Sequence, residues 1–215
     1  MSEETRTGGL VSKLLKAICL VVIFGVIAFL LLRIFLAEYY PARMKQLYPS
    51  EELVAAYEAD PSLEMHRQRL RISYDDPNFS LFMASNQFYC PTTGEFQITL
   101  RYNNSTLEEV AKDFSLPQIP TADPALFDYS LVDNKGNRTP LTCVWTESKF
   151  MYQYMKLVTS DVDFSKDPGW IRIEVYYKDA VDYGEEAYSR IPVYEKELVG
   201  DDTVFTLRAE ELVPW

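Results

Sequence analysis

The sequence of 215 residues contains a single histidine, His66, and this scarcity limits the sites that it can build. A metal centre made of several histidines cannot form within one chain, and a Ser-His-Asp or Cys-His site would have to use His66 alone. Gly-rich phosphate loops, Cys-x-x-Cys pairs and the Gly-x-Ser-x-Gly motif are absent as well. The sequence therefore predicts no catalytic, cofactor-binding or metal-binding residues. We expect His66 on the exposed surface of a helix, because charged residues flank it.

Glycine and cysteine are also scarce, with 8 and 3 residues, whereas aromatic residues make up 14% of the chain. This composition argues against a low-complexity or disordered protein. Cys19 lies in an apolar run, which leaves Cys90 and Cys143 as the one pair in the rest of the chain. Whether these two form a disulfide stays open, because the distance between them cannot be read from the sequence.

A long apolar segment near the N-terminus is the clearest signal present. Residues 17–32 are all apolar, Arg33 follows, and residues 34–37 are apolar again. As a helix, residues 17–37 would be about 31 Å long, enough to cross a bilayer core of roughly 30 Å. A cleaved signal peptide is the rival interpretation, but a cut after Ala37 would place the bulky Phe35 at the −3 position. We therefore predict a retained transmembrane signal-anchor helix over residues 14–40.

The flanks of this segment predict its orientation. Arg33 lies near one end and can extend its charge to the headgroups, and Tyr39 and Tyr40 fit the interfacial aromatic belt. Positive charge slightly favours a cytoplasmic N-terminus, and a short tail before one long apolar segment behaves as a signal-anchor. We expect a cytoplasmic tail at residues 1–13, with residues 41–215 outside the cytoplasm.

Net charge restricts the partners of the outer portion. The whole chain carries −11, and residues 38–215 carry −13 because the first 37 residues are net positive. Phosphate backbones would repel such a domain, so we expect no nucleic-acid partner. A basic partner would be attracted to it.

Residues 41–70 predict a helical juxtamembrane stalk. Ser50 is a candidate N-cap with Glu51 in the first turn, and Asp60 with Pro61 repeats the pattern for a second helix. The stalk would either hold the domain away from the bilayer or pack on it.

Alternating patterns begin near residue 72. Residues 95–103 place Phe96, Ile98 and their alternate neighbours on one face and Gln97, Thr99 and Arg101 on a wet face. Residues 170–178 alternate in the same way, with Arg172, Glu174 and Lys178 on the wet side. A tight turn at residues 133–137 predicts a hairpin over 127–146, and Pro192 predicts an edge strand.

One helix interrupts the strands, over residues 104–114, with Ser105 or Thr106 as its cap. Seven or eight short antiparallel strands with one inserted helix predict a mainly β fold, an antiparallel β-sandwich of immunoglobulin-like architecture over residues 71–215. The Cys and Trp spacing of antibody domains is absent, so the expectation concerns architecture and no family.

Three further patterns have ordinary explanations that we prefer. Asp75, Asp76 and Asn78, like Asp161, Asp163 and Asp167, do not match a calcium-binding loop and suit turns. The Asn-x-Ser/Thr sequons at Asn78, Asn103, Asn104 and Asn137 matter only in a eukaryotic secretory pathway. Phe150, Tyr152 and Tyr154 would form an aromatic platform for sugar or peptide if they faced outward, but buried sheet positions also select aromatics.

These observations favour a single-pass membrane protein that displays a binding or assembly module to a protein or carbohydrate partner. The first alternative is an accessory subunit of a membrane complex, with residues 17–37 packed on other helices. The second is a cell-envelope glycoside hydrolase that uses two of the 30 acidic residues in the outer portion.

Overall fold

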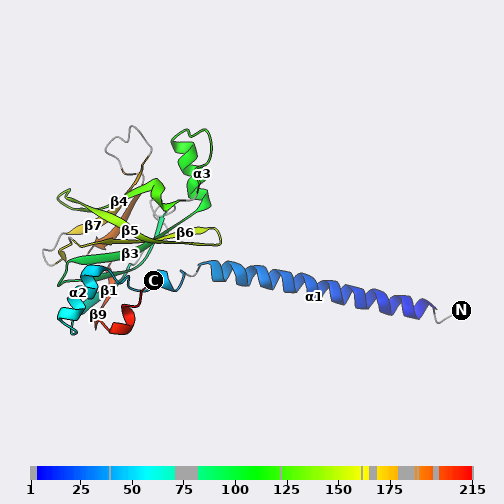
Figure 1. The fold of residues 1–215 in the computed structure, drawn as a ribbon. Coiled ribbons are helices and arrows are strands. Elements are labelled where there is room, and N and C mark those ends of the chain that lie inside the picture. The colour runs from blue at the N-terminus through cyan, green and yellow to red at the C-terminus, as the bar shows by residue number, and fades with distance from the viewer. Residues whose placement is uncertain are drawn as a thin grey trace. The chain divides into compact units, whose positions relative to one another are not determined.

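A computed structural model describes residues 4–38, 40–70, 82–121, 123–160, 162–164, 169–178, 187, 189–195 and 199–214 (Figure 1). The chain forms two compact units, Met1–Tyr39 and Tyr40–Trp215. The stretch from residue 40 to residue 70, which was expected to form a stalk, belongs to the same compact unit as the sheet.

The described part of the second unit contains one antiparallel sheet of nine strands. In sheet order the strands are β8 (Ser189–Glu195), β7 (Trp170–Tyr177), β4 (Phe127–Asp133), β5 (Arg138–Lys149), β6 (Tyr152–Thr159), β3 (Glu95–Asn103), β2 (Phe82–Cys90), β1 (Glu64–Leu70) and β9 (Val199–Thr206).

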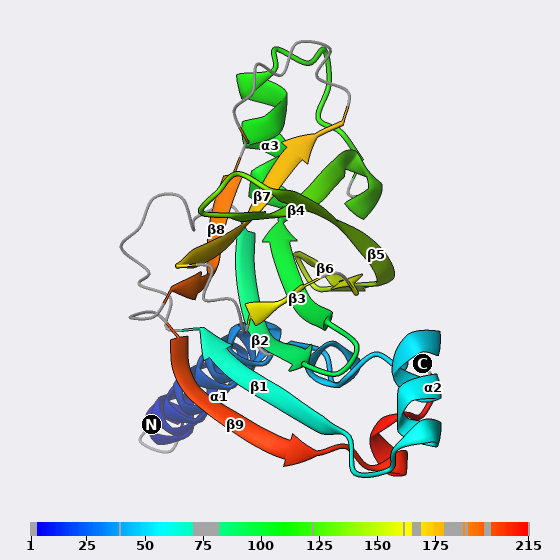
Figure 2. The same ribbon diagram turned by 90° about the vertical axis from the view of Figure 1, so that its left-hand side faces the viewer.

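The sheet curls so that its edge strand β8 returns to β2 (Figure 2). The Gln87 side-chain amide on β2 donates a hydrogen bond of 2.7 Å to the backbone carbonyl of Val193 on β8. The main core lies inside this curl, and it is built from the apolar faces of β3, β4, β6, β7 and β8 with Phe82 and Tyr89 of β2. Alternation of apolar residues along these strands places one face of each in this core, whereas Met65 of β1 and Phe205 of β9 belong to a second, smaller cluster beneath α2.

The mainly β, antiparallel fold is confirmed, but the immunoglobulin-like sandwich is not. Strand β5 pairs with β4 along one edge and with β6 along the other, so the strands form one continuous sheet. A bulge between Cys143 and Trp145 interrupts the β5–β6 register, and bulges of this kind let a strand bend. Curling of one sheet encloses the core that two sheets were expected to enclose.

The inserted helix is confirmed as α3 (Asn104–Asp113), which lies at one end of the curled sheet (Figure 2). Leu107 and Val110 are buried in the core. Its N-cap is Asn103, whose side-chain oxygen accepts the Thr106 N–H at 3.2 Å, and not Ser105 or Thr106.

Only the first helix of the predicted stalk is present. Helix α2 (Glu51–Ala59) is capped by Ser50, which accepts the Leu53 N–H at 3.1 Å. The expected second helix is wrong, because Glu64–Leu70 forms strand β1 between β2 and β9. Asp60 instead accepts hydrogen bonds from the Ser62 backbone and hydroxyl, at 2.9 and 2.6 Å, which closes a turn. Pairing on both edges outweighs the weak local preference for helix.

Two local predictions are confirmed. Strands β4 and β5 form the expected hairpin, with Gly136 at φ +83° and the Asp133 carboxylate accepting the N–H groups of Lys135 and Asn137. Pro192 lies in β8, which is an edge strand as predicted. Proline suits that position because it has no N–H to donate to a neighbour.

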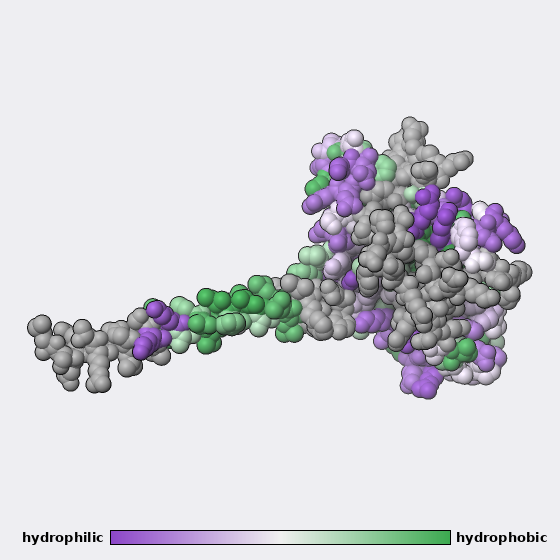
Figure 3. Space-filling view, turned by 180° about the vertical axis from the view of Figure 1, so that it is seen from behind, coloured by the Kyte–Doolittle hydropathy of each residue, from purple (hydrophilic) through white to green (hydrophobic). Residues whose placement is uncertain are grey.

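The first unit contains helix α1 (Glu4–Glu38). Its stretch Leu15–Leu32 is 18 residues long, is apolar enough to cross a membrane and is not buried by the rest of the chain (Figure 3). The helix is compatible with a single-pass anchor. Tyr39 and the side chain of Arg33, which were expected to mark the end of the span, lie outside the described residues.

Two glycines with positive φ provide a matched test of backbone packing. A Cβ at Gly94 (φ +68°) would lie 2.8 Å from the Ser160 carbonyl oxygen and 3.0 Å from that of Val162, whereas a Cβ at Gly136 would meet nothing within 4 Å. We expect G136A to lower the free energy of unfolding by about 1–2 kcal/mol, the cost of the left-handed conformation. G94A should lose a further ~1–3 kcal/mol because rigid backbone atoms must shift. Urea unfolding in mild detergent, followed by tryptophan fluorescence, measures both; equal losses would contradict the close approach.

Candidate functional site

The second face of the sheet is covered by the chain that connects α1 to α2, here called the linker (residues 40–50). The side chains of Gln97, Thr99 and Arg101 on β3 were predicted to be wet, but all three are buried. This part of the prediction is wrong because an alternating strand shows which residues share a face and does not show what covers that face.

Side chains of β3 hold the linker by hydrogen bonds to its backbone. The Thr99 hydroxyl donates to the carbonyl oxygen of Met44 at 2.7 Å. The Gln97 amide donates to the Tyr48 carbonyl oxygen at 2.7 Å, and its own oxygen accepts the Tyr48 N–H at 2.8 Å. Buried polar groups need such partners, so these bonds select one path for the linker.

Lys156 on β6 lies next to Thr99 in the β3–β6 register and is fully buried. Its ammonium donates to the Gln46 carbonyl oxygen at 2.9 Å and lies 5.0 Å from the centre of the Phe88 ring. Burial disfavours the charged form and lowers the pKa of Lys156 to about 7, although the nearby Glu95 carboxylate acts in the opposite direction.

Glu95 at the start of β3 is the carboxylate of this polar layer. The Ser50 hydroxyl donates to one of its oxygens at 2.5 Å, and the Gln97 amide donates to the other at 2.5 Å. Burial raises the pKa of Glu95, and these two hydrogen bonds oppose the rise. Ser50 therefore both caps α2 and fastens the end of the linker to the sheet.

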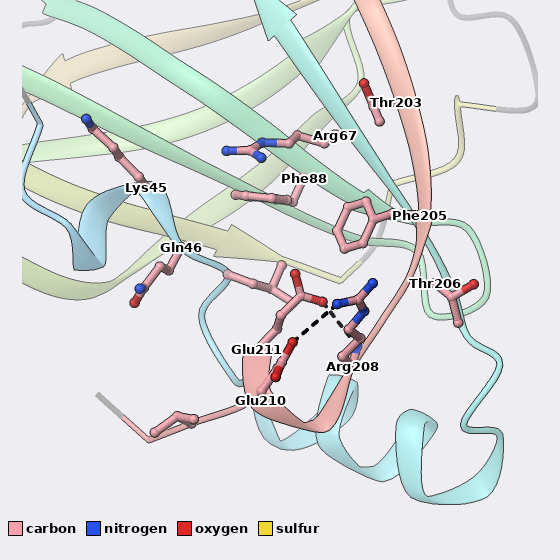
Figure 4. A pocket seen from close by; sticks show the side chains of 12 residues that line it. Lys45, Gln46, Arg67, Phe88, Thr203, Phe205, Thr206, Arg208, Glu210 and Glu211 are labelled. Atoms are coloured by element: carbon pink, nitrogen blue, oxygen red, sulfur yellow. Dashed lines mark hydrogen bonds and ion pairs between the residues drawn. The ribbon is translucent and has the colours of Figure 1, made fainter.

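A groove of about 990 Å³ opens beside the linker on the same face of the sheet. Its walls come from the linker, from β1, β2 and β9, and from the C-terminal residues that follow β9 (Figure 4). The lining residues are Lys45, Gln46, Leu47, Arg67, Phe88, Thr203, Phe205, Thr206, Arg208, Glu210, Glu211 and Val213.

Arg67 and two aromatic rings form the floor of the groove. Arg67 on β1 pairs in register with Phe88 on β2 and with Thr203 on β9, so the three share a row across the sheet. Its guanidinium carbon lies 5.6 Å from the centre of the Phe88 ring, and Phe205 lies beside them (Figure 4). The Arg67 Nε is buried and has no hydrogen-bond partner within the described part of the chain.

The far rim of the groove is formed by the single-turn helix η5 (Ala209–Glu211). Glu211 accepts the Arg208 backbone N–H at 3.1 Å, and Glu210 lies 3.4 Å from the Arg208 guanidinium. Both rim carboxylates are thus engaged locally.

The groove is suited to bind an anionic group next to an apolar one. Arg67 is half-buried and positively charged, so a carboxylate bound at the exposed part of its guanidinium would form a charge-assisted hydrogen bond. The half-buried Phe205 ring offers apolar surface near this contact, whereas the Phe88 ring is buried against the Arg67 guanidinium.

A second charged cluster lies on the outer face of β5, β7 and β8. Glu174 was predicted to be wet, but it is buried, with side-chain nitrogens of Arg172, Arg138 and Arg190 at 2.6, 3.0 and 3.5 Å. The Tyr176 hydroxyl also donates to Glu174. The arginines shield this carboxylate from solvent, so we assign the cluster a stabilising role.

The aromatic platform suggested by the sequence does not form. Tyr154 is buried, Tyr152 is half-buried and Phe150 is exposed, so the three do not present one surface. The Tyr40 ring of the linker lies 5.2 Å from Tyr154 in an edge arrangement and covers it. His66 is half-buried on β1, with its ring 6.2 Å from Tyr89, and not on the predicted exposed helix.

Cys90 and Cys143 are both free thiols. Cys90 is buried beneath α2, whereas Cys143 is exposed. Cys143 lies opposite the buried Leu157 in the β5–β6 register, yet its side chain is exposed.

The remaining sequence candidates contribute little to a site. Asp163 is exposed, and Asp75, Asp76, Asn78, Asp161 and Asp167 lie outside the described residues. Asn103 caps α3, Asn104 begins it, and Asn137 bonds to Asp133 in the hairpin turn. Among the residues that the structure describes, no group of three His, Cys, Asp or Glu side chains is placed to hold a metal ion.

The sequence did not identify Arg67 as a candidate binding residue. Arg67 lies in the segment for which a helix was predicted, so its alternation with Met65 was not interpreted as a strand with one polar face. Lys156 left a detectable signal, since it is a lysine within an otherwise apolar and aromatic stretch of strand.

Comparisons of the chain with protein-family models, with curated proteins and with solved structures find no match. The function has to be argued from the groove and its surroundings.

The buried lysine predicts an unusual dependence of stability on pH. Between pH 7 and about 10, Lys156 is neutral in the folded chain and charged in the unfolded chain, so the unfolded state binds more protons. Stability should therefore rise from pH 7 to pH 9.5, by at most about 1.4 kcal/mol per pH unit from this group.

Replacement by methionine isolates this contribution. K156M should remove the rise, whereas K178M, at an exposed lysine paired with Asp128, should keep it. Urea unfolding at pH 7, 8 and 9.5 measures the difference. Parallel pH profiles for K156M and the parent chain would contradict the assignment.

Proposed function

We propose that the chain is a single-pass, membrane-anchored binding or assembly module whose groove binds a segment of a partner protein. Helix α1 is the signal-anchor, its N-terminus is cytoplasmic, and residues 41–215 lie outside the cytoplasm. The nine-stranded sheet is the rigid part that presents the groove.

The groove at Arg67 is the observation that supports this proposal. It combines a guanidinium with an unsatisfied buried Nε, two aromatic rings and two threonines within about 990 Å³. A concave, partly apolar site with a few converging polar groups is typical of ligand recognition. Its occupant should carry an apolar side chain next to a carboxylate.

The net negative charge of the domain restricts the kinds of partner that it attracts. Residues 38–215 carry −13, so a partner with a basic surface is attracted at long range and a nucleic acid is repelled. The carboxylate that enters the groove supplies specificity, because Arg67 is the cation on its floor. The accessory-subunit alternative uses the same groove, with a neighbouring subunit as the partner.

The groove does not support the alternative function, a glycoside hydrolase. Two carboxylates would have to face each other across a cleft. Glu210 and Glu211 line the groove as consecutive residues on one turn, and both interact with Arg208. We therefore propose no second function.

Selection from a library of random displayed peptides tests the groove. Full-length chain in nanodiscs should enrich peptides with Asp or Glu next to an apolar residue. R67Q and F205A should each weaken binding of a selected peptide by at least about tenfold, which is about 1.4 kcal/mol. R172Q, outside the groove, should bind like the parent chain. Loss of enrichment, or R67Q binding like R172Q, would overturn the proposal.

Thiol labelling in intact cells tests the orientation. Cys143 is exposed, Cys90 is buried and Cys19 lies in the apolar stretch of α1. A membrane-impermeant maleimide added outside the cells should label the parent chain and leave C143S unlabelled. Labelling of Cys143 only after the cells are lysed would place the domain in the cytoplasm instead.

A further inference from the structure

The turn between β5 and β6 exposes two large apolar side chains. Phe150 is 57% exposed and Met151 is 45% exposed. The turn is held in place, since the Asn104 N–H donates to the Met151 carbonyl oxygen at 3.2 Å. Phe150 has a positive φ of 60°, which is uncommon for a bulky residue and tends to persist at functional positions.

The base of this turn is also the place where the chain leaves for α1. Tyr40, the first residue of the linker, packs against Tyr154, and the Arg101 guanidinium lies 5.1 Å from the Tyr40 ring and 4.4 Å from the Tyr152 ring. Tyr152 directly follows the turn. The end of α1 at Glu38 is only two residues from Tyr40, a distance of at most about 7 Å along the chain.

The turn at the opposite end of β5 is polar. The turn that joins β4 to β5 consists of polar residues and glycine, with Lys135 exposed. Exposed apolar side chains in the two turns of β5 therefore occur only at the end that is tied to α1.

We propose that the β5–β6 turn inserts Phe150 and Met151 into the headgroup region of the bilayer that holds α1. The proposal rests on the proposed membrane anchor. An aromatic ring and a methionine at the end of the domain from which the chain leads to a membrane helix match the preference of amphipathic and aromatic groups for the interface. The turn and α1 together would then restrict the rotation of the domain, so that the groove keeps one orientation to the membrane.

Quenching by brominated lipids tests the insertion. Full-length F150W and K135W are each reconstituted in phosphatidylcholine nanodiscs with and without bromine near the headgroup end of the acyl chain. The emission added by the new tryptophan, relative to the parent chain, should be quenched and blue-shifted in F150W only. M151W serves as a second probe if F150W alters the thermal unfolding of the domain.

The outcomes separate this proposal from the anchor. Unquenched emission from F150W and M151W in chain that resists alkaline carbonate extraction would overturn the insertion and keep the anchor. Emission that is blue-shifted but unquenched would mean that a second copy or another protein covers the turn, and would also overturn it. Release of the chain by carbonate would overturn both proposals.

Discussion

Burial of polar groups between the linker and the sheet is the constraint on which this structure depends. Gln97, Thr99 and Lys156 lie on a strand face that water would otherwise cover, and each is paired with a backbone group of the linker. An unpaired buried donor is costly, so the linker has little freedom to follow another path. The chain between the apolar helix and the sheet is for this reason a fixed part of the domain.

The position of the linker explains where the groove and the exposed turn occur. The linker covers β3 and β6 but leaves Arg67 and Thr203 accessible beside it, and the C-terminal residues close the far side. At its other end, Tyr40 fixes the start of the linker beside Tyr152 and Tyr154. One segment of eleven residues thus defines both one wall of the groove and the side of the domain that is tied to α1.

The sequence predicted correctly those elements that are determined by interactions between neighbouring residues. The hairpin follows from Asp133 and Gly136, and the edge position of β8 follows from Pro192, because turn chemistry and the missing N–H act within a few residues. The helix predicted at β1 was wrong because contacts with distant segments determine the conformation there. Asp60 and Pro61 suggested a helix start, but pairing with β2 and β9, which are distant in the sequence, determined the conformation.

The sequence by itself determined the apolar helix, the acidic character of the rest of the chain and the alternation of its strands, since each depends on composition or on neighbouring residues. Tertiary structure alone decided that the strands form one curled sheet, that the polar face of β3 is buried, and that Arg67 lies beside Phe88 and Phe205. Those outcomes depend on contacts between segments far apart in the chain, such as Lys156 with Gln46, and periodicity within one segment carries no information about which distant segment will cover it.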